Sequence, residues 1–76
     1  MVGGSERQAL KIVAEKGGEI GAHTVSRAMK VDPNYARMLL NSLARADYVD
    51  LRASGRYRIT YKGKSELERK KETGFQ

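Results

Sequence analysis

Apolar residues recur at helical spacing in two stretches near the start of the chain. The first predicts a helix over about 5–16, with Ser5 as a good N-cap and two glycines after its end. The second predicts a shorter helix over about 22–30, after an extended link that contains Ile20. The residues at helical spacing are Ala9, Ile12 and Val13 in the first stretch and Val25, Ala28 and Met29 in the second.

A third apolar stripe predicts a helix over about 33–46. Asp32 can cap its first turn, and Pro33 suits the first helical position because the missing N–H has no partner there in any helix. The stripe has the spacing of a buried face and consists of Ala36, Leu39, Leu40 and Leu43. Asp47 tolerates left-handed backbone geometry better than most residues, so it is expected to end this helix.

Alternating residues after position 47 predict a β-hairpin. One strand covers 48–52 and the other 56–61, and a turn at 53–55 joins them. The side chains expected on the inner face are Val49, Leu51, Tyr57, Ile59 and Tyr61. Ile20 is expected to pair with the edge of this hairpin.

These elements indicate one small α+β domain over residues 1–76, with a three-helix core and a small antiparallel hairpin. The compact part covers about 5–63. Residues 64–71 suit a short polar helix, and 72–76 are expected to fray.

The net charge of +6 is concentrated in the middle of the chain. Residues 27–64 carry nine basic and three acidic side chains, whereas the charges of 1–26 and of 65–76 cancel. A localised positive field attracts a polyanion and speeds encounter with it. A solvated, solubilising surface is the alternative explanation, although solubility alone does not require the charge to be localised.

Three segments resemble the winged helix-turn-helix domains of bacterial and archaeal transcriptional regulators. Residues 24–31 are similar to the second helix of that family, residues 36–49 to its recognition helix and exit strand, and 57–63 to its second wing strand. The resemblance covers about 6–68. Asp47 stands where the family usually has glycine, and the long C-terminal helix that many relatives use to dimerise has no obvious counterpart.

This resemblance implies that the chain binds double-stranded DNA as a transcriptional regulator. The recognition helix over 33–46 would enter the major groove, where Arg37 can donate two hydrogen bonds to guanine, and the basic wing over 52–58 would contact the backbone or minor groove. About six phosphate contacts would make the affinity fall roughly 10³-fold between 50 and 200 mM salt. The expected DNA contacts are Asn34, Tyr35, Arg37, Met38, Asn41 and Arg45 in the helix, Arg52, Ser54, Arg56 and Arg58 in the wing, and Arg27, Lys30 and Lys62 nearby.

Other classes of function have less support in the sequence. The chain has no cysteine and a single histidine, His23, so no metal or cofactor is expected, and no nucleophile–base pair indicates an enzyme. Met29 and Met38 are more typical of packing residues than of redox chemistry. No apolar run is long enough to span a membrane and no signal peptide is recognisable, which favours a cytoplasmic protein. A winged-helix module that binds proteins, an RNA-binding winged helix and a homodimer remain open alternatives.

Overall fold

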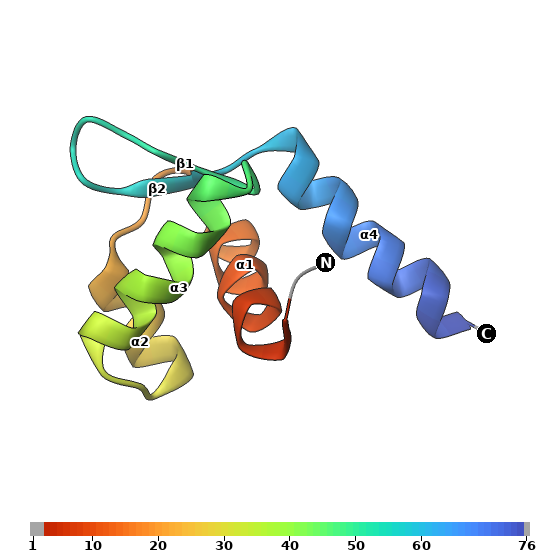
Figure 1. The fold of residues 1–76 in the computed structure, drawn as a ribbon, viewed down its shortest axis with the longest axis horizontal. Coiled ribbons are helices and arrows are strands. Elements are labelled where there is room, and N and C mark those ends of the chain that lie inside the picture. The colour runs from red at the N-terminus through yellow and green to blue at the C-terminus, as the bar shows by residue number, and fades with distance from the viewer. Residues whose placement is uncertain (1–2, 76) are drawn as a thin grey trace.

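The computed structural model describes the backbone of residues 3–75 and the side chains of residues 3–69. Three helices form the body, a two-stranded antiparallel hairpin covers one end of them, and a fourth helix follows the hairpin (Figure 1). The elements are α1 (Gly4–Lys16), α2 (Ala22–Met29), α3 (Pro33–Arg45), β1 (Val49–Leu51), β2 (Tyr57–Ile59) and α4 (Tyr61–Phe75). The prediction of a small α+β domain with this order of elements is confirmed.

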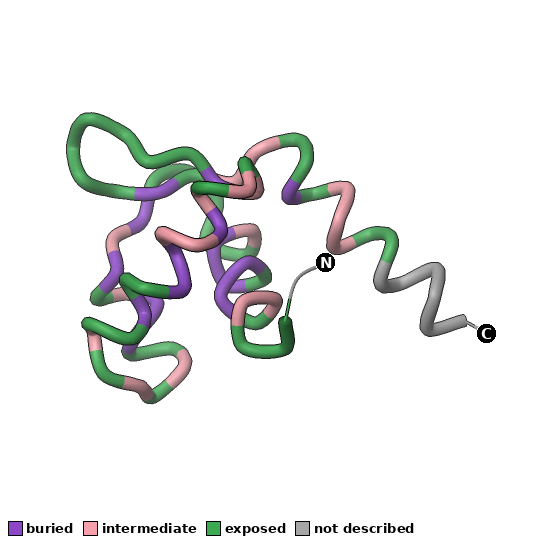
Figure 2. Tube along the Cα trace, in the orientation of Figure 1, coloured by how far each residue is buried: buried purple, intermediate pink, exposed green. Residues whose placement is uncertain are grey.

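The core lies between the three helices and the inner face of the hairpin (Figure 2). Burial of apolar side chains there is the main force that holds so small a chain together. The apolar stripes predicted for α1 and α3 are buried as expected. The largest fully buried side chains are Leu10, Val13, Val25, Leu40, Leu43 and Val49. In α2 the prediction for Ala28 is wrong, because Ala28 is exposed and Ser26 takes the inner position. Ser26 is tolerated inside because its hydroxyl donates to the carbonyl oxygen of His23 at 2.9 Å.

The ends of the helices follow local hydrogen bonding. Asp32 caps α3 as predicted, since its carboxylate accepts from the backbone N–H of Asn34 at 2.8 Å. Asp47 adopts the expected left-handed conformation, with φ of +69°, directly after the last turn of α3. The prediction of Ser5 as a cap is wrong: α1 begins one residue earlier, because the Glu6 carboxylate reaches back to the backbone N–H of Gly3 at 3.2 Å.

Residues 52–56 connect the two strands, and 53–55 form the turn. Backbone hydrogen bonds also connect the hairpin to Ile20 of the α1–α2 link. In the loop, Gly55 has φ of +87° and its N–H donates to the Arg52 carbonyl at 2.9 Å. Ile20 and Tyr57 exchange two backbone hydrogen bonds of 2.9 and 2.7 Å, which confirms the predicted pairing. The register is Val49 with Ile59, Asp50 with Arg58, and Leu51 with Tyr57.

Two side chains expected on the inner face lie outside. Leu51, the last residue of β1, is 52% exposed although its cross-strand partner Tyr57 is buried. Tyr61 is 84% exposed, because β2 ends at Ile59 and Tyr61 is the first residue of α4.

The fourth helix starts earlier and is longer than the predicted segment 64–71. The Thr60 hydroxyl accepts from the N–H of Gly63 at 3.1 Å and donates to the carbonyl oxygen of Asp47 at 2.6 Å, so Thr60 caps α4 and binds its start to the end of α3. The helical backbone continues through Phe75, where a frayed end was expected, and Gln76 lies outside the described residues. The hairpin loop and α4 extend in opposite directions from the body (Figure 1).

Candidate nucleic-acid interface

A tight turn joins α2 to α3 and sets the angle between them. Lys30 ends α2 in the left-handed region, with φ of +60°, and the N–H of Val31 donates to the carbonyl oxygen of Ser26 at 3.0 Å. Two residues later Asp32 caps α3. The pair packs through the buried face of α3, so the opposite face of α3 is left to solvent.

The solvent face of α3 carries cations and amides and no carboxylate. Its exposed residues are Asn34, Tyr35, Arg37, Met38 and Arg45. The Arg37 Nη1 atom donates to the Asn34 side-chain oxygen at 3.3 Å, which aligns the guanidinium along the first turn. Met38 is 62% exposed, so it is not a core packing residue and stays among the predicted DNA contacts.

Asn41 differs from the other predicted contacts on α3. It is only half-exposed, and its side-chain oxygen accepts a hydrogen bond of 2.7 Å from the hydroxyl of Tyr57 in β2. The sequence places Asn41 on the outer side of the helix but gives no sign that a tyrosine 16 residues later reaches it. Asn41 is therefore held by β2 and is not a freely rotating side chain.

Two of the four predicted wing contacts are held by Glu19 of the α1–α2 link. Arg52 pairs with Glu19 at 3.3 Å and with Asp50 at 3.0 Å, and the Ser54 hydroxyl donates to the second Glu19 oxygen at 3.2 Å. Both side chains are exposed but already have partners, so a phosphate would compete with Glu19 for them. The pairing of Ile20 with Tyr57 causes this, because it brings the preceding Glu19 beside the wing.

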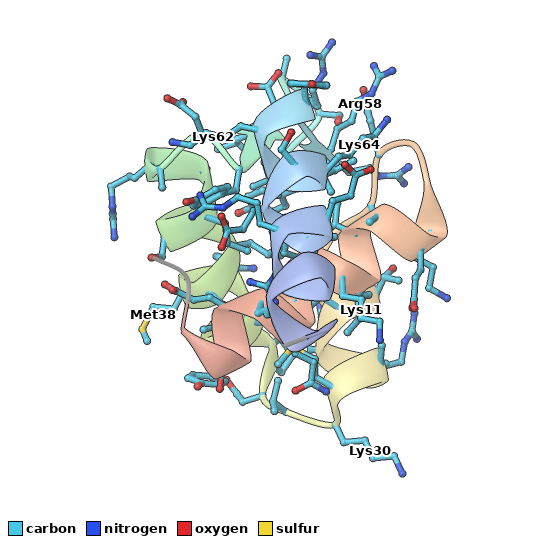
Figure 3. All side chains as sticks on the ribbon, turned by 90° about the vertical axis from the view of Figure 1, so that its right-hand side faces the viewer. Lys11, Lys30, Met38, Arg58, Lys62 and Lys64 are labelled. Atoms are coloured by element: carbon cyan, nitrogen blue, oxygen red, sulfur yellow. The ribbon has the colours of Figure 1, made fainter. Side chains whose placement is uncertain are left out.

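The other two wing arginines, Arg56 and Arg58, are exposed on the outer face of the hairpin. Figure 3 shows Arg58 on the opposite side of the molecule from Met38 of α3. Arg58, one of the expected DNA contacts, thus lies away from the part of α3 that carries Met38. Arg56 lies next to the turn, opposite Arg52, whose backbone N–H donates to the carbonyl oxygen of Arg56 at 2.8 Å.

Lys62 binds the end of α3. Its ammonium donates to the carbonyl oxygen of Ala46 at 2.8 Å and lies 4.8 Å from the centre of the Tyr48 ring. A cation at this place is favourable because the last carbonyl groups of a helix carry partial negative charge. Its role as a phosphate contact is not supported by this geometry.

Arg27 and Lys30 of α2 are exposed, as predicted, and no ion pair involves them within the described residues. Together with Arg37 and Arg45, they give residues 22–46 four cationic side chains against one acid. That acid, Asp32, is engaged in the cap of α3. The α2–α3 unit thus has a net positive outer surface.

A hydrogen bond between Ser42 and Glu6 links the flank of α3 to the start of α1. The Ser42 hydroxyl donates to Glu6, and this bond, together with the bond from the Gly3 N–H, lowers the pKa of Glu6 below the ordinary 4.5. Sequence reasoning did not find this contact, because the two residues are 36 positions apart.

This contact predicts a pH dependence of stability. A lowered pKa in the folded state stabilises the protein above the pKa of the unfolded chain, and the effect is lost as pH falls through the folded value. We expect Ser42→Ala to lower the free energy of unfolding at pH 7 by up to about 1 kcal/mol, since the pair is partly exposed to solvent. Urea unfolding should show this difference shrinking from pH 6 to pH 3, and a difference that grows on acidification would contradict it.

Outside this face, an open groove lies between α1 and Leu67 of α4, beside the ion pair of Arg7 with Glu66 at 3.3 Å. Across the described residues, no three His, Asp or Glu side chains come together in a way that could hold a metal ion. None of the helices over these residues combines the length and the apolar character needed to cross a membrane.

The site therefore consists of the outer face of α2 and α3 with the tip of the hairpin beside it. Comparison with known proteins adds no assignment: no family model matches the chain, and no curated protein is significantly similar to it.

Proposed function

We propose that the chain is a winged helix-turn-helix domain that binds double-stranded DNA and acts as a transcriptional regulator. The observation that carries the proposal is the outer face of α2 and α3, which has four cationic side chains and no free carboxylate. The hairpin next to α3 corresponds to the wing.

The geometry of α3 suits the major groove. That groove, about 12 Å wide, admits one α-helix and presents a different pattern of donors and acceptors for each base pair. Arg37 and Asn34 lie in the exposed first turns of α3, where a docked helix usually meets the base edges. Arg45 at the far end and Arg27 and Lys30 on α2 would contact phosphates on either side.

The wing has a smaller part in this proposal than the sequence predicted. Arg56 contacts a phosphate from the tip, and Arg52 supports the wing through Glu19 and Asp50. Arg58 lies on the other side of the molecule from Met38 of α3, so we leave it out of the proposed DNA surface.

Two substitutions test this division. Arg37→Ala should weaken binding to a preferred sequence by about 1–3 kcal/mol and relax the choice of base at one position. Arg56→Ala should weaken binding to all duplexes to a similar extent, because a phosphate contact carries no sequence information. Both effects can be measured by fluorescence anisotropy with a preferred and a scrambled duplex.

Lys11→Ala is the matched control for these two variants. It removes one positive charge from an exposed position on α1, and Figure 3 shows Lys11 on the opposite side from Met38. Its affinity should stay within about twofold of that of the unchanged protein, since exposed charges beyond the Debye length are largely screened. Equal losses for Lys11→Ala and Arg37→Ala would defeat the proposed docking.

A protein-binding module is the second candidate, and one observation favours it. Tyr35, Met38 and Leu51 are 39%, 62% and 52% exposed, and Tyr35 and Met38 are neighbours on the outer side of α3. A module of this kind would show no salt-sensitive affinity for duplex DNA. The same anisotropy titration therefore separates the two functions.

A further inference from the structure

Tyr57 connects three parts of the molecule at one point. Its backbone pairs with Leu51 in the hairpin and exchanges two hydrogen bonds with Ile20 of the α1–α2 link. Its ring is 4% exposed, and its hydroxyl crosses to α3, where it donates to the side-chain oxygen of Asn41 at 2.7 Å. Because the ring is fixed by core packing, the hydroxyl has little freedom to move away from Asn41.

This hydrogen bond orients the two ends of the Asn41 amide. The side chain has an acceptor oxygen at one end and an NH₂ donor at the other. The oxygen is turned toward Tyr57, and no partner of the NH₂ group is found among the described residues. No buried side-chain nitrogen or oxygen among these residues lacks a partner, so the NH₂ group of Asn41 is not fully buried.

We propose, as an extension of the DNA-binding function above, that Tyr57 is a positioning residue which makes Asn41 a hydrogen-bond donor toward the major groove, so that Asn41 selects guanine or thymine.

The donors and acceptors on the base edges in the major groove determine which bases an amide in this orientation can bind. Guanine presents the acceptors O6 and N7, and thymine presents O4. The familiar pairing of asparagine with adenine requires both ends of the amide, the oxygen for N6 and the nitrogen for N7. With its oxygen held by Tyr57, Asn41 cannot accept from the N6 amino group of adenine or the N4 amino group of cytosine, so adenine offers it only the single acceptor N7 and cytosine offers none. A site with a fixed donor rejects bases that present donors.

Tyr57→Phe removes only the hydroxyl and keeps the ring in the core. We would measure relative affinities for a duplex library randomised at each position, using the full chain, Tyr57→Phe, Asn41→Ala and the double variant. The unchanged protein should disfavour adenine and cytosine at one position by about tenfold. Tyr57→Phe should reduce that discrimination to about threefold or less, since the released amide can rotate by half a turn, and Asn41→Ala should abolish it.

The double variant distinguishes positioning from a general structural role. If Tyr57 acts through Asn41, the hydroxyl has no further effect on base preference once Asn41 is alanine. An equal loss of discrimination from Tyr57→Phe in both backgrounds would overturn the proposal, because a structural role does not depend on the amide.

Asn41→Asp gives a second test that does not depend on how well Tyr57→Phe folds. The aspartate keeps an acceptor for the Tyr57 hydroxyl but presents an acceptor to the groove in place of a donor. The base preference of the Asn41→Asp variant at the same position should move toward cytosine, when each affinity is divided by the affinity of that variant for a random duplex.

The outcomes also separate this proposal from the function on which it rests. Salt-sensitive DNA binding with no base preference at the Asn41 position, or with a preference for adenine or cytosine, overturns the role of Tyr57 and leaves DNA binding intact. If the unchanged protein binds no duplex in the same assay, both proposals are wrong.

Discussion

Replacing Gly63 by alanine is expected to lower the melting temperature of this domain by about 15 °C. Gly63 is buried in the first turn of α4. A Cβ atom built there overlaps the carbonyl oxygen of Tyr48 and lies 2.8 Å from Cγ1 of Ile59, where no relaxed side chain fits. One of these obstacles is backbone and cannot rotate away, so the cost should reach the upper end of the range for overpacking, about 3 kcal/mol. A domain of this size loses about 4–8 °C per kcal/mol.

Gly4→Ala is the matched control, because it adds the same methyl group to a helical glycine with no atom within 4 Å of the new Cβ. Alanine is favoured over glycine in a helix by roughly 0.5–1 kcal/mol, so this variant should melt at the same temperature or slightly higher. Thermal unfolding followed by circular dichroism compares the two. A Gly63→Ala protein that melts together with Gly4→Ala would mean that α4 does not pack on the end of β2 as the structure shows.

Much of the fold could be predicted from local sequence signals. The stripe from Ala36 to Leu43, the cap at Asp32 and the left-handed residue Asp47 each follow from chemistry within one or two turns of the chain. Such signals are self-contained, because a capping side chain or an apolar stripe has the same effect wherever the rest of the chain lies. The pairing of Ile20 with the hairpin also followed from pattern alone.

The start of α4 could not be predicted from local sequence signals. The predicted helix over 64–71 leaves out Lys62 and Gly63, and glycine is unfavourable inside a helix. Gly63 is instead required inside the first turn because α4 approaches Tyr48 and Ile59 closely. Because this close approach depends on tertiary structure, the low helix propensity of glycine wrongly predicted that Gly63 lies outside the helix.

The candidate interface was predicted less completely, for a related reason. Composition places nine cations between residues 27 and 64 but does not say which of them already have partners. Arg52 and Lys62 are engaged by Glu19 and by the carbonyl oxygen of Ala46, partners 33 and 16 residues away. A charge count along the chain therefore gives an upper limit to the number of phosphate contacts, and the folded structure lowers it.

The salt dependence of DNA binding is expected to report this reduced number. Arg58 and Lys64 lie on the other side of the molecule from Met38. Without these two and the engaged Arg52 and Lys62, five of the nine cations remain for the proposed surface, namely Arg27, Lys30, Arg37, Arg45 and Arg56. Each neutralised phosphate releases counterions and contributes about −0.9 to the slope of log K against log salt concentration. The slope should therefore be about −4.5, and affinity should fall about 500-fold between 50 and 200 mM salt.

Single substitutions divide the cations into two groups in the same measurement. Arg45→Ala should reduce the magnitude of the slope by about one, because an exposed cation on α3 is lost from the DNA surface. Arg52→Ala is the matched control, since its guanidinium is paired with Glu19 and Asp50 and should leave the slope within about 0.3 of the original. If Arg52→Ala reduces the magnitude of the slope as much as Arg45→Ala does, the ion pairs of Arg52 must open on DNA binding, and the wing lies closer to the duplex than the unbound structure indicates.

A slope near zero for the unchanged protein would exclude a phosphate-contacting surface and favour the protein-binding alternative at Tyr35 and Met38.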